Sequence, residues 1–359
     1  MEQNESKWIA QLSEMALASS QVDSSLYAKY DVKRGLRDIN GKGVLAGLTQ
    51  IGEVQAHPEG DEAGPGHLIY RGMDVEDLVA GFLPEGRPGY EETCYLLLGG
   101  ELPRREELAG FGGLLGSYRD LPHYFVRDSL LALSSRDMMN GMAQSILALY
   151  TLDDAADDVS LPNVMRQCLK LIATFPLLAV YSYQASSYRH AGKSLVIHTP
   201  RPDLSTAENF LHMLRSDSRY TPLEAQLLDL ALVLHAEHGG GNNSTFTTHV
   251  VTSSLTDTYS VIAAAMGSLK GPRHGGANAK VVAMFDELKR EVKDWSNDRQ
   301  VEDYLYKLLR KEAFDRSGLI YGIGHAVYST SDPRTQILRG QVQKLAAEKG
   351  VSEEMDLYM

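Results

Sequence analysis

Helical periodicity is the feature of this sequence that most restricts how the chain can fold. Apolar residues recur at intervals of three and four along most of the chain, as they do on the buried face of an amphipathic helix. Ser205–Glu208 and Thr221–Glu224 each place a hydroxyl residue three positions before a glutamate, which is the pattern of a capping box. Ser296 and Asp332 are further candidate caps, and Gly350 predicts a helix end. The pattern predicts an all-α fold.

Strand signals are confined to the N-terminal part. Only Val44–Val54 and His67–Tyr70 have the composition of strands, and they flank a region rich in glycine, proline and acidic residues. This arrangement predicts a minor N-terminal β-hairpin. We expect a large helical domain over residues 1–276 and a small helical domain over residues 277–359, with the boundary just after a histidine-bearing loop.

The composition excludes several classes of protein. The chain has 35 Lys and Arg against 47 Asp and Glu, a net charge of −12, which argues against nucleic acid or an anionic membrane as a partner. Cys94 and Cys168 give no disulfide framework or cysteine zinc site, which suits a reducing cytosol. The N-terminus has no apolar signal core, and Pro176 breaks the longest apolar stretch, Leu171–Val180, which is too short to span a bilayer. We therefore expect a cytoplasmic protein.

Three glycine-flanked segments carry histidines. They are Leu234–Ser244, Gly271–Asn278 and Gly322–Val327, and the last is followed by Asp332-Pro333-Arg334. Histidines at three such junctions of a helical chain suggest a polar site built between helices.

His238 is expected in the last turn of a helix that ends at Gly239. A helix C-terminus favours a cation, so a protonated His238 would bind a carboxylate or a carbonyl oxygen. The alternative is a histidine that caps the last carbonyls of the helix. A metal site of His235, His238 and His249 is also conceivable, but their spacing matches no zinc template.

His274 stands in a Gly-Pro-x-His-Gly-Gly turn that opens a helix. A helix N-terminus disfavours a positively charged imidazole, and a neutral histidine can donate a hydrogen bond to a carbonyl oxygen that gains charge. The alternative is a tight turn with an incidental exposed histidine.

His325 follows Gly322 and Gly324, but no strand precedes this pair, so a dinucleotide fingerprint is rejected. The loop could instead wrap a ligand with its backbone groups. Arg334 falls in the first turn of the helix that Asp332 starts, where a guanidinium and free N–H groups attract a carboxylate. The alternative for Arg334 is a solvent-facing helix residue.

Together these segments resemble those of citrate synthases. The three specific motifs are His-Ala-Glu-His-Gly-x-x-Asn, Gly-Pro-x-His-Gly-Gly-Ala-Asn and Gly-His-Ala-Val followed by Asp-Pro-Arg. Shorter matches at Tyr70–Gly72, Leu96–Pro103 and Ala207–Leu211 extend the resemblance over most of the chain.

The resemblance implies a transferase of the tricarboxylic acid cycle that condenses oxaloacetate with acetyl-CoA and hydrolyses citryl-CoA. It implies an almost entirely helical homodimer, with the dimer interface on the large domain and CoA bound by the small one. Acetyl-CoA is then a co-substrate, and no permanently bound cofactor and no metal are implied.

The resemblance also implies a role for each matching residue. His274 would polarise the acetyl thioester carbonyl, and His325 would donate a hydrogen bond or a proton to the oxaloacetate carbonyl. His238, Arg334 and Asn242 would hold oxaloacetate. The loop that contacts CoA, largely through its backbone, would contain Leu319, Gly322, Gly324 and Ala326.

One part of the family pattern is missing. The catalytic base of the family is an aspartate in a later Asp-x-x-Ser-Gly-like segment, and two more substrate arginines lie beyond it, one of them from the partner subunit. Asp356 lacks the following Ser-Gly, and Asp332 is expected to be a helix cap. We therefore expect a C-terminally truncated relative with little or no synthase activity.

Three alternatives remain open at this point. A 2-methylcitrate synthase, which uses propionyl-CoA, shares these residues, and one methylene is worth only about 1–3 kcal/mol in a hydrophobic pocket. A citryl-CoA-cleaving lyase fits less well. A helical dimer that binds oxaloacetate or CoA without turnover is the non-enzymatic alternative.

Overall fold

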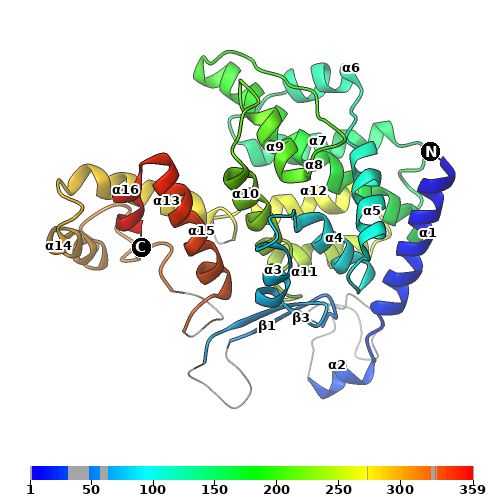
Figure 1. Ribbon diagram of the computed structural model, residues 1–359, viewed down its shortest axis with the longest axis horizontal. Helices are drawn as coiled ribbons and strands as arrows, with labels where there is room; N and C mark the ends of the chain where they lie inside the picture. Colours follow the sequence, from blue (N-terminus) through cyan, green and yellow to red (C-terminus); the bar gives the residue numbers. More distant parts are fainter. Residues whose placement is uncertain are drawn as a thin grey trace. The chain divides into compact units, whose positions relative to one another are not determined.

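The computed structural model in Figure 1 describes residues 2–30, 48–56, 64–272, 274–324, 328 and 330–358. Its described elements are helices apart from three short strands, so the predicted all-α fold is confirmed. The chain divides into two compact units, Met1–Gln55 with His67–Ser268, and Ala56–Gly66 with Leu269–Met359. The division lies near the sequence-based boundary at 276/277, and it assigns the short segment Ala56–Gly66 to the smaller unit.

The larger unit holds the sheet and most of the helices. Its elements, with the last residue of α12 at the boundary, are α1 Glu2–Ser19, α2 Ser25–Lys29, β1 Gly52–Gln55, β2 His67–Tyr70, β3 Met73–Asp74, α3 Val75–Phe82, α4 Tyr90–Gly99, α5 Arg105–Ser117, α6 His123–Phe125, the π-helix η1 Val126–Leu131, α7 Met138–Leu149, the 3₁₀ helix η2 Tyr150–Leu152, α8 Leu161–Ala191, α9 Thr206–Leu214, α10 Pro222–Leu234, α11 Asn243–Thr252 and α12 Thr258–Leu269.

The smaller unit contains four described helices, two of which enclose its core. They are α13 Ala277–Glu291, α14 Asp298–Leu309, α15 Pro333–Lys349 and α16 Ser352–Tyr358. The apolar faces of α13 and α14 meet in a core of Met284, Leu288, Val292, Tyr304 and Leu308. These residues recur every four positions, so the pattern in the sequence corresponds to the buried face of each helix.

The predicted hairpin is present as an antiparallel pair. β1 pairs with β2, with Gly52 opposite Tyr70 and Gln55 opposite His67, and the short strand β3 extends the sheet. The first strand is shorter than the predicted Val44–Val54: it begins at Gly52, and residues 44–47 lie outside the described residues.

The long helix α8 forms the centre of the larger unit and packs against α1, α5, α7 and α9 (Figure 1). Pro176 lies inside this 31-residue helix, so the expectation that Pro176 breaks the apolar stretch is wrong. Proline removes one helical hydrogen bond, and the burial of Leu177, Leu178 and Val180 on the same turns offsets this loss. The helix is long and apolar enough to cross a membrane, yet 56% of its most apolar window is buried, as in a core helix.

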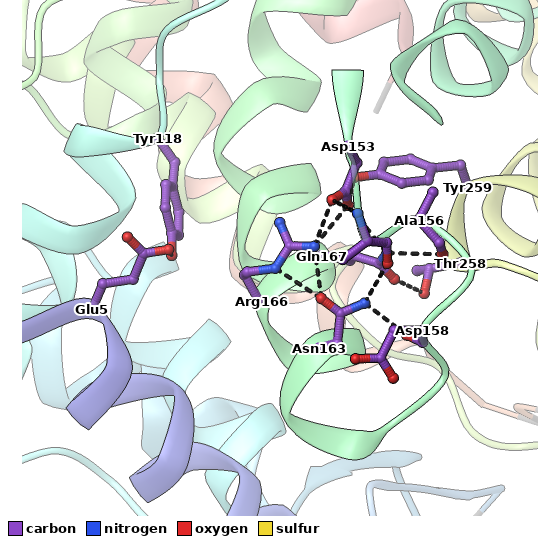
Figure 2. A network of polar contacts seen from close by, with 11 residues as sticks. Glu5, Tyr118, Asp153, Ala156, Asp158, Asn163, Arg166, Gln167, Thr258 and Tyr259 are labelled. Atoms are coloured by element: carbon purple, nitrogen blue, oxygen red, sulfur yellow. Dashed lines mark hydrogen bonds and ion pairs between the residues drawn. The ribbon is translucent and has the colours of Figure 1, made fainter. Parts of the chain in front are cut away.

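A buried polar network ties α8 to the loop before it and to α12 (Figure 2). Arg166 donates to both carboxylate oxygens of Asp153 at 2.7 and 2.8 Å, and the Tyr259 hydroxyl donates to Asp153 at 2.7 Å. Gln167 donates to Asp153 at 3.1 Å and accepts from the Thr258 hydroxyl at 2.5 Å. Burial raises the pKa of Asp153, but these donors outweigh it and lower that pKa to about 2.

Three of the four predicted helix caps are confirmed. Ser205 and Thr221 form the predicted capping boxes, and Asp332 caps α15, which ends at the left-handed Gly350. The predicted cap Ser296 is wrong by one residue, because the neighbouring Asn297 accepts the hydrogen bond from the Gln300 amide instead.

Candidate active site

The loop that carries His238 begins earlier than expected. Helix α10 ends at Leu234 with His235 as its C-cap, so His238 lies beyond the helix and not in its last turn. His235 therefore occupies the helix end that was expected for His238, and its Nδ1 lies 2.6 Å from the carbonyl oxygen of Ala231. His235 is thus the capping histidine, and His238 stands in an irregular segment before the left-handed Gly239.

Residues from the hairpin hold the backbone next to His238. The amide of His238 donates to Glu237 Oε1 at 3.0 Å. The buried hydroxyl of Tyr70 donates to the carbonyl oxygens of Val233 and Glu237, at 3.0 and 3.1 Å. A Cβ added at Gly52 would lie 2.4 Å from Glu237 Cγ, so glycine at this position of β1 makes room for the glutamate.

Glu237 is a half-buried carboxylate beside this loop. Burial raises its pKa, against the lowering effect of the amides of Gly239 and His238 and of the charge on Arg71. The Arg71 guanidinium itself donates to the carbonyl oxygens of Leu97, at 3.0 and 2.9 Å, and of Ser19, at 2.8 Å. Tyr70 therefore holds the histidine loop by direct hydrogen bonds, whereas Arg71 acts on Glu237 through its charge.

Asn242 follows as the N-cap of α11. Its Oδ1 accepts from the Thr245 amide at 2.9 Å, and its Nδ2 donates to the Gly239 carbonyl at 3.0 Å. Both ends of the side chain thereby fix the loop that contains His238. Contact of Asn242 with substrate stays a prediction.

His274 lies in a tight turn that leads into α13, as the sequence predicts. Its amide donates to the Gly271 carbonyl at 3.0 Å, and its carbonyl accepts from the Ala277 amide at 3.1 Å. A Cβ on Gly276 would lie 2.5 Å from the Lys270 carbonyl oxygen, so only glycine allows the chain to close this tightly. The turn places His274 three residues before Ala277, the first residue of α13.

The predicted CoA loop is exposed and contacts the same helix. Leu319 is 57% exposed, and Gly322 and Gly324 have φ of +88° and +87°, which side-chain-bearing residues rarely adopt. A Cβ built on Gly322 would lie 3.4 Å from a methyl group of Val281 on α13. His325 and Ala326, the remaining predicted residues of this stretch, lie outside the described residues.

Arg334 lies in the first turn of α15, where the sequence places it. Its Nε and its terminal nitrogen donate to the Asp332 carboxylate at 3.0 and 2.6 Å, and its amide donates to the same carboxylate at 2.9 Å. The guanidinium thus already holds a carboxylate in the two-pronged geometry that a substrate carboxylate would use. No group of three or more metal-ligating side chains exists among the described residues.

The predicted residues fall into two groups. His238 and Asn242 share one loop of the larger unit, whereas His274, the glycine loop and Arg334 belong to the smaller unit. Gly52 and Glu237 could not be identified from the sequence, because the contact between them joins distant segments of the chain and has no local signal.

Comparison with known proteins agrees with these motifs. The family described as citrate synthase, C-terminal domain, matches residues 36–359. Citrate synthase of Haloferax volcanii is 35% identical over 326 residues, which cover 89% of this chain and 76% of that protein. The 2-methylcitrate synthase of Shewanella oneidensis is 34% identical over 309 residues, covering 86% and 73%.

Solved structures give the same result. Citrate synthase from Thermoplasma acidophilum, in a ternary complex with carboxymethyl coenzyme A and oxaloacetate, matches with a TM-score of 0.69 and 27% identity, covering 89% of this chain and 75% of that one. Citrate synthase from Pyrobaculum aerophilum matches with a TM-score of 0.69 and 28% identity, covering 90% and 76%. The fold and these relatives define an enzyme of the acyltransferase type. The chain belongs to the citrate synthase family.

Proposed function

We propose that this enzyme condenses oxaloacetate with the acetyl group of acetyl-CoA and hydrolyses the product to citrate and free CoA. The observation that carries this proposal is the position of His274. Its turn leads into α13, and α13 contacts Gly322 of the exposed glycine loop through Val281. A thioester held along that loop would have its carbonyl near a histidine of the same unit.

The chemistry assigns a step to each predicted residue. His274 would polarise the thioester carbonyl while the methyl group loses a proton and the enol forms. The enol carbon then bonds to the ketone carbon of oxaloacetate, whose oxygen His325 would protonate. His238, Arg334 and Asn242 would hold the oxaloacetate carboxylates. Water then cleaves the thioester, and CoA leaves as the free thiol, so the proposal needs no permanent cofactor and no metal.

The base that removes the methyl proton has no matching residue in the 359 positions. Asp315–Gly318 comes closest to the Asp-x-x-Ser-Gly pattern, with one residue fewer, and Lys280 and Tyr321 donate to the Asp315 carboxylate. A positioned base commonly contributes about 10²–10⁴-fold. We propose that a polypeptide of these 359 residues alone turns over slowly.

The decisive experiment measures release of the CoA thiol from acetyl-CoA with and without oxaloacetate. Release that depends on oxaloacetate and falls in His274→Ala, but not in the exposed control His123→Ala, would support the proposed reaction. Thiol release that is the same without oxaloacetate, or the same in His274→Ala as in the wild type, would contradict the proposed reaction. If turnover is too slow to detect, oxaloacetate should still raise the melting temperature of the wild type and not of His238→Ala, and equal shifts in both would refute the assignment of His238.

The choice of acyl-CoA is a separate proposal. Both citrate and 2-methylcitrate synthases are among the relatives, at 35% and 34% identity. We infer a preference for acetyl-CoA, which predicts a higher kcat/KM with acetyl-CoA than with propionyl-CoA when both are assayed at saturating oxaloacetate. The reverse order would favour a 2-methylcitrate synthase, with the same residues in the same roles.

A homodimer and a cytoplasmic location complete the proposal. Large apolar side chains are exposed on helices of the larger unit, such as Met138 and Leu147 on α7 and Phe246 and Val250 on α11. Contiguous patches of exposed apolar side chains mark protein interfaces, and we infer that these residues belong to such a patch. The expected particle mass in light scattering is therefore twice that of the chain, and a monomer that binds oxaloacetate would contradict this. The two free cysteines fit a reducing compartment.

A further inference from the structure

A cluster of polar and aromatic side chains precedes the glycine loop in the smaller unit. Asp315 is its centre: Lys280 of α13 donates to Asp315 Oδ2 at 3.0 Å, and the Tyr321 hydroxyl donates to the same oxygen at 2.7 Å. The Ser317 amide donates to the other carboxylate oxygen at 3.1 Å. Donors from Ser317, Tyr321 and Lys280 lower the pKa of Asp315, and Asp315 raises the pKa of Lys280, so both groups are charged at neutral pH.

Aromatic contacts surround the same lysine. Lys280 Nζ lies 5.6 Å from the centre of the Phe314 ring and 5.9 Å from that of Tyr321, within the range of a cation–π contact. The two rings meet edge to face, with their centres 5.9 Å apart at an angle of 81°. One lysine of α13 therefore contacts the carboxylate and both rings.

The backbone at Phe314, just before the glycine loop, has a conformation that residues with side chains rarely adopt. Phe314 has a φ of +53°, which is unfavourable for a bulky side chain. Its amide donates to Glu287 Oε1 at 2.7 Å, and Glu287 also accepts from the Tyr304 hydroxyl at 3.1 Å. A strained conformation persists only where its surroundings fix it. The contacts with α13 and α14 thus fix the chain immediately before Leu319.

We propose that Lys280, Asp315 and Tyr321 form a clamp that positions the glycine loop 319–324 on α13 for acyl-CoA. The inference rests on the proposed function, in which this loop contacts CoA. Tyr321 is adjacent to Gly322, and Lys280 is adjacent to Val281, which faces Gly322. The clamp therefore joins the loop to the helix that His274 precedes, and it sets where a thioester bound on the loop lies relative to that histidine.

These three side chains contact one another and are positioning residues, so their loss should weaken CoA binding without affecting oxaloacetate. If the clamp keeps the loop in its binding conformation, the apparent Kd rises in inverse proportion to the fraction of molecules in that conformation. A fall of this fraction to between about a third and a tenth would raise the Kd for CoA about three- to tenfold.

The test is calorimetric titration of CoA into the wild-type chain and into Asp315→Asn and Tyr321→Phe. The matched control is Asp303→Asn, since Asp303 is an exposed carboxylate of α14 with no hydrogen bond or ion pair to the described residues. Lys280→Arg should retain binding, because arginine keeps the charge that Asp315 and the rings require.

The outcomes separate the clamp from the proposed function. A CoA Kd raised at least threefold in Asp315→Asn and raised in Tyr321→Phe, with the melting-temperature shift by oxaloacetate unchanged in both, is the expected result. Wild-type affinity in both variants would overturn the clamp and leave the proposed function intact. No binding of CoA by the wild-type chain would overturn the proposed function and the clamp together. Loss of both ligands in Tyr321→Phe, which lacks only one hydroxyl, would show a general loss of folding and also refute a role confined to the loop.

Discussion

Gly52 and Glu237 show how single residues decide the shape of the candidate site. A Cβ at Gly52 would lie 2.4 Å from Glu237 Cγ and 2.8 Å from Glu237 Oε1, and Oε1 accepts the hydrogen bond of the His238 amide. A methyl group in this space must displace the glutamate. The position of His238 therefore depends on a residue of β1.

The substitution Gly52→Ala should weaken oxaloacetate binding and destabilise the larger unit. Overpacking of this kind costs about 1–3 kcal/mol. The measurements are the melting temperature and its shift by oxaloacetate. Gly81→Ala is the control: a Cβ there meets no atom within 4 Å, so alanine in helix α3 should be neutral or stabilising. An unchanged oxaloacetate shift in Gly52→Ala would show that Glu237 does not position His238.

The sequence predicts the local turns around the candidate site residues better than the long-range contacts that surround them. The tight turn before α13 follows from local glycines, and the structure shows it around His274. The place of His238 was wrong, because His235 ends the helix one turn earlier than the glycines suggest. Contacts such as that of Tyr70 with Glu237, 167 positions apart, have no local pattern from which they could be read.

At the scale of elements, the starts of helices follow from local chemistry, whereas their lengths depend on packing. Capping boxes at Ser205 and Thr221 are satisfied within four residues, so the sequence determines them. Helix α8 runs through Pro176 because the buried residues around it outweigh one lost hydrogen bond. The polar network in Figure 2 then fixes the start of that helix against α12.

Removal of one hydroxyl tests this network. Tyr259→Phe takes a donor from Asp153, whose side chain is only 7% exposed, and should cost about 1.5–3 kcal/mol of unfolding free energy. Because donors depress the pKa of Asp153 to about 2, its contribution is present above the unfolded value of 3.8 and is lost as pH falls towards 2. As the pH is lowered, Tyr259→Phe should therefore begin to lose stability at a higher pH than the wild type does. Tyr183→Phe on the exposed side of α8 is the control, and equal urea midpoints of Tyr259→Phe and wild type would contradict the expectation.

At the scale of the whole molecule, the sequence predicted the fold class and the hairpin, but not which segments form each unit. The segment Ala56–Gly66 joins the smaller unit, where the Gly66 amide donates to the Ser331 carbonyl at 3.4 Å. A Cβ on Gly66 would lie 2.1 Å from the Tyr328 ring, so this close approach requires glycine. These contacts join positions more than 260 residues apart, and helical periodicity carries no information about them.

The dependence of global stability on pH should reflect Asp229, a buried carboxylate that links two helices. From α10 it accepts the amides of Gly89 and Tyr90 at the start of α4, at 2.7 and 3.2 Å. Burial raises its pKa to about 7, against the lowering effect of the Gly89 amide and with a further rise from the charge of Glu91. A folded-state pKa above the unfolded value of 3.8 means that the neutral form is favoured by folding. The stabilisation of the folded state by neutral Asp229 is fully present below pH 3.8 and is lost as the pH rises through 7.

Asp229→Asn removes this titration, because an amide is neutral at every pH. The variant loses one of the two hydrogen bonds at α4, since the amide nitrogen cannot accept from a backbone N–H. At pH 5 it should therefore be less stable than the wild type by about 1–3 kcal/mol. Between pH 5 and pH 8 the wild type should lose free energy of unfolding relative to the variant, because ionisation of a buried carboxylate disfavours the folded state. Urea unfolding of both proteins at the two pH values measures this change, and Asp303→Asn, which removes an exposed carboxylate of α14, is the control for the loss of one carboxyl group. A constant difference between Asp229→Asn and wild type would mean that Asp229 is already ionised at pH 5 in the folded protein, as it is in the unfolded chain, and would contradict the raised pKa.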